Sequence, residues 1–223
     1  MPAFALCIEL GVPGIEIDVQ VCKSGELVVI HDFDLDRLAG ISAVIKELSY
    51  RELSAIDVGS RFSPKYKGTG VPLLTQVLDR FGKDLYFDLE IKTAGTENEG
   101  IANKILSLIA EKKLKDRCLI SSFNPYVLRS IKDIDPNQPT ALIYSKIRDL
   151  YFFLRHGEGR FAAHCDALKP GWEQVSELSI WWNKKLWGYP IIPWTVDDPK
   201  VASRLLKLNV DGLISNQPYL LIS

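Results

Sequence analysis

Short apolar runs recur along the chain, most of them followed by a helical pattern, and this alternation most constrains the fold. The runs are rich in β-branched or aromatic residues and bounded by Gly, Pro, Asn or Asp, as buried strands are. Helical patterns stand at 98–113 and after Asp198-Pro199, where proline suits the first helical position. The expected strands are 14–19, 27–31, 85–92, 118–123, 141–144, 167–169, 191–196 and 210–215.

Strands that alternate with helices predict βαβ units and a parallel sheet. The number of expected strands favours an α/β fold of the TIM-type (β/α)8 barrel over a doubly wound sheet. The chain also lacks the GxGxxG and Walker A motifs of nucleotide-binding sheets. Residues 40–71 interrupt the alternation with a short helix at 48–53 and a Gly-, Ser-, Pro- and Lys-rich stretch. We predict one domain over 1–223, with an insertion at about 40–71 near one mouth of the barrel.

Charge and cysteine usage exclude several classes of protein. The 27 Lys and Arg residues balance 28 Asp and Glu residues, which argues against a nucleic-acid partner. No apolar run reaches the length of about 18 residues that a transmembrane segment needs. The four scattered cysteines form no CxxC motif, so we expect reduced, mostly buried thiols. With no signal-peptide pattern at the N-terminus, these features favour a cytoplasmic protein, and they leave its oligomeric state open.

Residues 172–187 form an unusually aromatic helical pattern. We interpret its tryptophans as side chains that pack against a sheet or a partner surface. They are Trp172, Trp181, Trp182 and Trp187.

Carboxylates fall on the strand faces that ought to be buried. Because a strand has a period of two residues, Glu16 and Asp18 share one face of the run 14–19. Glu90 and Lys92 share a face of the run 85–92 and lie at its C-terminal end, where barrel enzymes keep their active sites. His31 also closes a strand.

This spacing supports two interpretations. Three converging carboxylates beside a lysine and a histidine predict a site for a hard cation, Ca²⁺ or Mg²⁺, since zinc prefers more nitrogen or sulfur ligands. The alternative is a structural ion-pair network, with Glu90 paired to Lys92 and Asp18 paired to Arg37.

Ten short motifs, taken in order, resemble the glycerophosphodiester phosphodiesterase family over essentially the whole chain. Each motif is weak alone, but their common order makes the resemblance strong. They are GVPGIEIDV (11–19), KSGELVVIHD (23–32), LDR (35–37), LSYREL (48–53), DVG (57–59), VPLL (71–74), LEIK (89–92), SSF (121–123), WTV (194–196) and VDGLI (210–214).

The resemblance implies metal-assisted hydrolysis of glycerophosphodiesters to sn-glycerol 3-phosphate and an alcohol. It implies one divalent cation, Ca²⁺ or Mg²⁺, held by Glu16, Asp18 and Glu90. His31 matches the second of the family's two catalytic histidines. Lys92 matches a lysine near the substrate phosphate, and Trp194 matches an aromatic residue at the pocket wall.

The chain departs from the family pattern at its start. The family's first strand ends in His-Arg-Gly and is followed by Pro-Glu-Asn-Thr and a helix, which residues 3–5 match. The first catalytic histidine has no counterpart, and we do not expect His156 or His164 to replace it. We expect a longer chain to begin upstream of Met1; the alternative is a natural chain without this strand. Loss of one barrel strand leaves two unpaired edges.

Two other functions stay open. A descendant that binds a phosphorylated ligand without catalysis would also lack the first histidine. A phosphodiesterase of the lysophospholipase D or sphingomyelinase D kind would have a more apolar barrel mouth. The tryptophans at 181, 182 and 187 are compatible with such a mouth, so this alternative stays open. Comparing glycerophosphocholine with lysophosphatidylcholine as substrates separates this class from the first.

The missing histidine predicts weak or no activity in the chain of 223 residues. We expect this chain to hydrolyse glycerophosphocholine more slowly than about 1 s⁻¹, and an added upstream segment ending in Pro-Glu-Asn-Thr to raise both rate and stability. A steady-state assay of both chains checks this. A rate of about 1 s⁻¹ or more from the shorter chain would contradict the expectation.

Overall fold

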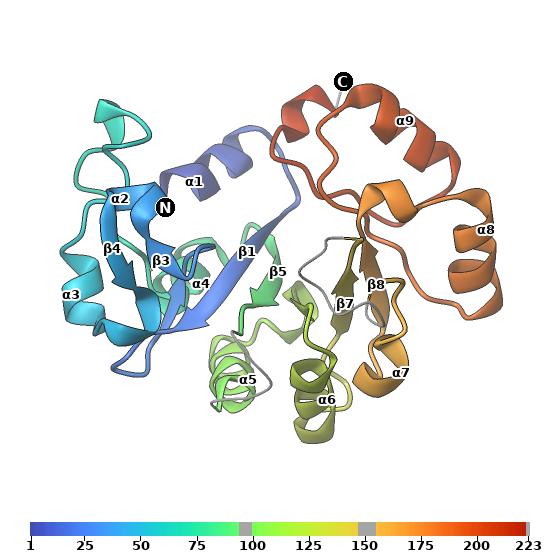
Figure 1. Ribbon diagram of the computed structural model, residues 1–223, viewed down its shortest axis with the longest axis horizontal. Helices are drawn as coiled ribbons and strands as arrows, with labels where there is room; N and C mark the ends of the chain where they lie inside the picture. The colour runs from blue at the N-terminus through green and yellow to red at the C-terminus, as the bar shows by residue number, and fades with distance from the viewer. Residues whose placement is uncertain (94–99, 147–154, 222–223) are drawn as a thin grey trace. The chain divides into compact units, whose positions relative to one another are not determined.

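The computed structural model describes residues 1–93, 100–146 and 155–221. By its contacts the chain divides into two units, Met1–Cys118 and Leu119–Ser223. The first runs from blue to green in Figure 1, and the second from yellow-green to red. The single domain expected from the sequence stays a prediction.

A pair of parallel strands forms the centre of the first unit. β1 (Gly14–Val21) pairs with β5 (Tyr86–Ile91) in a register that sets Glu16 opposite Asp88 and Asp18 opposite Glu90. β2 (Leu27–Val29) lies on the other side of β1. It runs antiparallel to β1, so the expectation of a purely parallel sheet is wrong here. The connection, which turns at Gly25 with a φ of +95°, is too short for the crossover that parallel strands need.

A second, smaller sheet begins just before the expected insertion at about 40–71 and extends into it. β3 (Asp34–Leu35), α2 (Asp36–Ala39) and β4 (Ile41–Val44) come first, followed by the 3-10 turns Ile45–Glu47 and Pro64–Tyr66. The predicted short helix is α3 (Tyr50–Ser54), which Ser49 and Glu52 begin as a capping box. These elements enclose a small core of their own. Its buried residues are Cys22, Val28, Ile30, Leu35, Ile45, Leu53 and Val71.

Three longer helices complete the first unit: α1 (Pro2–Glu9), α4 (Leu74–Phe81) and α5 (Ile101–Lys112). A 3-10 turn, Lys115–Arg117, precedes β6. The predicted stripe of α5 is confirmed, because Ile101, Ile105, Leu108 and Ile109 are buried. Residues 98 and 99 of the predicted helix lie outside the described residues.

The second unit holds three parallel strands in sequential order: β6 (Cys118–Ser122), β7 (Thr140–Tyr144) and β8 (Ala167–Pro170). α6 (Pro125–Ile134) joins the first two, so the predicted βαβ arrangement is confirmed here. The remaining helical segments are α7 (Arg160–Ala163), α8 (Glu177–Ile180), α9 (Pro199–Lys207), the π-helical turn η6 (Trp181–Leu186) and the 3-10 turns Trp172–Gln174 and Pro218–Leu220.

The strands expected at 191–196 and 210–215 are not regular strands. Ile191 and Trp194 form isolated bridges to Leu168 and Gly171, and Val196 donates a backbone hydrogen bond to Ile214. Pro193 interrupts the ladder because proline has no backbone N–H to donate. These segments therefore follow strand-like paths without forming a continuous ladder.

The cysteines match the expectation of reduced, mostly buried thiols. None of the four forms a disulfide, and only Cys7 is partly exposed. Burial raises the pKa of Cys118 to about 12 and that of Cys165 to about 11. Within the described residues, the longest apolar helices fall short of what a membrane crossing would require.

Asp57 organises the loop of the insertion. Its Oδ1 accepts hydrogen bonds from the backbone N–H groups of Gly59 and Ser60, at 2.8 and 2.9 Å. Its Oδ2 accepts from Ser60 Oγ at 2.6 Å and from the N–H of Gly68 at 2.8 Å. These donors, the Ser60 hydroxyl foremost, hold the pKa of Asp57 far below its usual value.

We therefore expect Asp57→Asn to lower the thermal midpoint at pH 7, because an amide NH2 replaces one accepting oxygen. The pKa of Asp57 is depressed in the folded state, so its contribution is present above about pH 4 and is lost as the pH falls further. Thermal melts between pH 7 and pH 3 should show the two proteins converging in acid. Exposed Asp84→Asn is the control; a pH-independent difference would contradict the assignment.

Candidate active site

Three carboxylates meet on one face of the β1–β5 pair. Asp18 and Glu90 are opposite each other in the register, and Glu16 lies two residues before Asp18 on the same face. Each offers an oxygen atom, and these atoms lie within 4.8 Å of one another. Glu90 is only 8% exposed, while Glu16 and Asp18 are half-buried. The convergence predicted from strand periodicity is therefore present in the structure.

Lys92 joins this cluster from the residue just after β5. Its backbone N–H donates to the carbonyl of Val19 at 3.0 Å, which continues the ladder. Its Nζ lies 3.5 Å from Asp18 Oδ1 and 3.6 Å from Glu90 Oε1. Of the expected ion pairs, that of Glu90 with Lys92 is present. Arg37 does not pair with Asp18 as expected, because its guanidinium binds Asp32 instead.

The carboxylate cluster has the donor chemistry of a hard-cation site. All three residues offer only oxygen, which Mg²⁺ and Ca²⁺ prefer. A zinc site would include histidine or cysteine, and neither belongs to this cluster. Lys92 lies beside the carboxylates, so the ion pairs and a cation site use the same residues in this structure.

His31 lies in the turn after β2, the strand next to β1. Its Nδ1 is 2.7 Å from Asp32 Oδ1, and Arg37 Nε donates to Asp32 Oδ2, also at 2.7 Å. The Arg37 hydrogen bond lowers the pKa of Asp32, which keeps this group a carboxylate. An ionised Asp32 favours the proton on Nδ1, which leaves Nε2 to exchange protons. Lys92 Nζ is 5.9 Å from the ring centroid of Phe33, so this turn borders the cluster.

Gln20 holds the backbone that carries His31, although it was not among the site residues predicted from the sequence. It is 4% exposed, and its Nε2 lies 2.9 Å from the carbonyl of Ile30 and 2.9 Å from that of Asp32. The carbonyl of His31 is 3.3 Å away. The period-two pattern that marks Glu16 and Asp18 continues to Gln20, so the signal was present in the sequence.

The second unit carries Trp194. Its indole Nε1 donates to the carbonyl of Lys169 at 3.0 Å, and its ring meets Phe123 edge-on with centroids 5.5 Å apart. Lys169 is 1% exposed and donates through Nζ to Ser121 Oγ at 2.9 Å. The sequence pattern predicts Lys169 only as part of a strand. A lysine inside a short apolar run was the signal that could have singled it out.

The other two histidines lie on the surface of the second unit. His156 is exposed, with Nδ1 3.7 Å from Glu158 Oε1. His164 is exposed as well, and its Nε2 is 2.9 Å from Arg129 Nη1. The surface position expected for His156 is thus present, while the expectation that neither histidine is catalytic stays a prediction.

Known proteins match the chain along nearly its whole length. The model of the glycerophosphoryl diester phosphodiesterase family matches residues 1–220. A glycerophosphodiester phosphodiesterase of Caldanaerobacter subterraneus subsp. tengcongensis is 34% identical, over 99% of this chain and 89% of that protein.

Solved structures show the same fold. An Oleispira antarctica phosphodiesterase, in complex with the product sn-glycerol-3-phosphate, is 25% identical with a TM-score of 0.85, over 99% of this chain and 87% of that one. A Parabacteroides distasonis glycerophosphodiester phosphodiesterase is 21% identical with a TM-score of 0.81, over 99% and 86%. The predicted α/β fold of the TIM-barrel type is thereby confirmed. The chain belongs to the glycerophosphoryl diester phosphodiesterase family.

Proposed function

We propose that this protein hydrolyses a glycerophosphodiester to sn-glycerol 3-phosphate and an alcohol. The observation that carries the proposal is the meeting of three carboxylates on β1 and β5 in a chain that matches the family over residues 1–220. The sn-glycerol-3-phosphate complex of the Oleispira antarctica relative supports the identity of the product. The free cysteines favour a reducing compartment, and we propose the cytoplasm.

Glu16, Asp18 and Glu90 would hold one divalent cation, either Ca²⁺ or Mg²⁺. Their donor set of oxygen atoms within 4.8 Å of one another fits such an ion. When bound, the cation stabilises the negative charge that develops on the phosphoryl oxygens. The register of β1 with β5 keeps Asp18 and Glu90 facing each other, so the protein holds these ligands on a sheet rather than on a mobile loop.

His31 would move a proton between the reacting oxygens. A positioned general acid or base contributes about 10²–10⁴-fold to the rate. Asp32 orients its ring, Arg37 keeps Asp32 ionised, and Gln20 fixes the backbone of the turn. In the family pattern His31 corresponds to the second of two catalytic histidines.

Lys92 and Trp194 would bind the substrate. The Lys92 ammonium, already beside two carboxylates, would pair with a phosphate oxygen. Trp194 would offer an aromatic wall whose orientation is fixed by its hydrogen bond to Lys169 and by the ring of Phe123.

The metal site is tested by Glu90→Gln. This change removes one ligand charge, so we expect the affinity for Ca²⁺ or Mg²⁺ to fall at least about tenfold and the release of sn-glycerol 3-phosphate to fall with it. Isothermal titration with each ion and an assay with glycerophosphocholine measure the two effects. Asp88→Asn is the matched control, because Asp88 lies on the same strand and face but outside the cluster.

Equal cation affinity in Glu90→Gln and the unchanged protein would contradict the proposed metal site. Cation binding with no detectable hydrolysis would favour the descendant that only binds a phosphorylated ligand. Faster hydrolysis of lysophosphatidylcholine than of glycerophosphocholine would favour the lysophospholipase D class.

The role of Gln20 is tested by Gln20→Met, which preserves length but removes the amide donor. We expect the free energy of unfolding to fall by about 1–3 kcal/mol, because carbonyls of a partly buried turn lose a donor. Displacement of His31 should lower kcat more than it changes KM. Chemical denaturation and steady-state kinetics measure these effects. Exposed Gln217→Met is the control. An unchanged kcat in Gln20→Met would contradict its positioning role.

A further inference from the structure

The segment formed by α8 and η6 has an inverted side-chain pattern. Ile180 and Asn183 point inward, at 6% and 8% exposed. The opposite stripe has helical spacing and faces solvent, yet four of its five members are large and apolar. A surface helix ordinarily places polar residues there. The stripe consists of Leu178, Trp181, Trp182, Lys185 and Leu186.

This stripe continues into a larger patch. Trp187 follows η6, and its ring meets Phe161 of α7 with centroids 6.0 Å apart. We call the six apolar residues together the aromatic patch; each is between 45% and 73% exposed. Large exposed apolar patches mark interaction surfaces. The aromatic patch consists of Phe161, Leu178, Trp181, Trp182, Leu186 and Trp187.

The residue types of the aromatic patch suit a lipid surface. Tryptophan concentrates at membrane–water interfaces, where its ring enters the apolar layer and its N–H stays among the headgroups. Half of the aromatic patch is tryptophan. Its helical part, from Glu177 to Leu186, is too short to span a bilayer but has the apolar stripe of a segment that lies in the interface plane.

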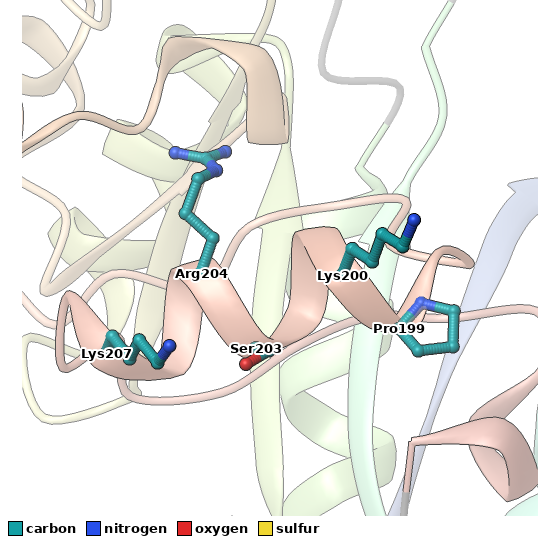
Figure 2. A pocket seen from close by; sticks show the side chains of 5 residues that line it. All are labelled: Pro199, Lys200, Ser203, Arg204 and Lys207. Carbon is teal, nitrogen blue, oxygen red and sulfur yellow. The ribbon is translucent and has the colours of Figure 1, made fainter.

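Basic side chains occur in the stripe and on the adjoining helix α9. Lys185 is exposed within the stripe, and α9 carries Lys200, Arg204 and Lys207 with no acidic residue between Pro199 and Lys207. Figure 2 shows these three cations extending from α9, where with Pro199 and Ser203 they line a shallow pocket. Exposed carboxylates also occur in this unit: Glu177 and Asp198 lie at helix starts, Asp211 pairs with Lys184, and Glu158 precedes α7.

Hydrogen bonds join α9 to the patch-bearing segment. Arg204 donates to the carbonyl of Val175, just before α8, at 2.8 Å. Lys184 of η6 donates to the carbonyl of Asn209, just after α9, and pairs with Asp211 at 2.8 Å. The basic face and the aromatic patch therefore belong to adjoining elements of one unit. Apolar anchors combined with cations are the two signals that stable binding to an anionic membrane needs.

We propose that the aromatic patch docks this protein onto a membrane surface that contains anionic phospholipid. The tryptophans enter the interface, and Lys185 with the cations of α9 pairs with the headgroups. This surface is distinct from the proposed active-site residues and does not depend on the proposed function.

The test is sedimentation of the 223-residue chain with vesicles of equimolar phosphatidylcholine and phosphatidylglycerol. The triple variant Trp181→Ser, Trp182→Ser, Trp187→Ser should bind these vesicles at least about tenfold more weakly. Lys200→Gln combined with Lys207→Gln should weaken binding to these vesicles but not to phosphatidylcholine alone. The control is Tyr126→Ser, which removes a 61% exposed aromatic residue of α6 outside the patch.

Two further measurements keep the test decisive if the triple variant folds poorly. Leu178→Glu changes the most exposed patch residue, at 73%, and should also weaken binding about tenfold. Tryptophan fluorescence of the unchanged protein should shift to the blue with anionic vesicles. No binding and no shift would overturn the proposal, and so would a patch-dependent dimer seen by sedimentation velocity without vesicle binding.

Discussion

The parallel pairing of β1 with β5 is the interaction on which the proposed site depends. Its register places Asp18 opposite Glu90 and brings Glu16 to the same face. Charged groups on a largely buried strand face are costly unless a cation or hydrogen bonds compensate them. Lys92 lies where it can compensate two of them, since the ladder continues to its own backbone N–H. Backbone pairing thus sets the distances, and side-chain chemistry determines what the cluster can bind.

The turn after β2 depends on the same sheet. β2 pairs with β1, and Gln20 of β1 reaches across to the carbonyls of residues 30–32. His31 is therefore carried by a backbone whose position is set from the strand that also carries Glu16 and Asp18. The Arg37–Asp32–His31 chain then sets which ring nitrogen is available. Strand β1 therefore carries two of the three carboxylates and also positions the turn that holds the histidine.

Local periodicity explains what the sequence could predict. Alternation placed Glu16, Asp18 and Glu90 on strand faces, and helical spacing identified the buried stripe of α5. Ion pairs between residues distant in sequence were harder to predict. Arg37 binds Asp32 rather than Asp18, and no local pattern distinguishes the two carboxylates.

The strand expected at 191–196 contains Pro193, and proline cannot donate a backbone hydrogen bond to a ladder. The sequence itself therefore indicated that this strand would be interrupted. The tryptophans at 181, 182 and 187 were predicted to pack against a sheet or a partner surface. In the structure these three side chains are half-exposed. Composition alone does not determine which face of a helix is buried.

Anomalous scattering from a crystal grown with Mn²⁺, an ion that accepts the same oxygen ligands, tests the central claim most directly. The account predicts one strong peak within coordination distance of carboxylate oxygens from Glu16, Asp18 and Glu90. A map without a peak there, with the Lys92 ammonium occupying the space between the carboxylates, would contradict it.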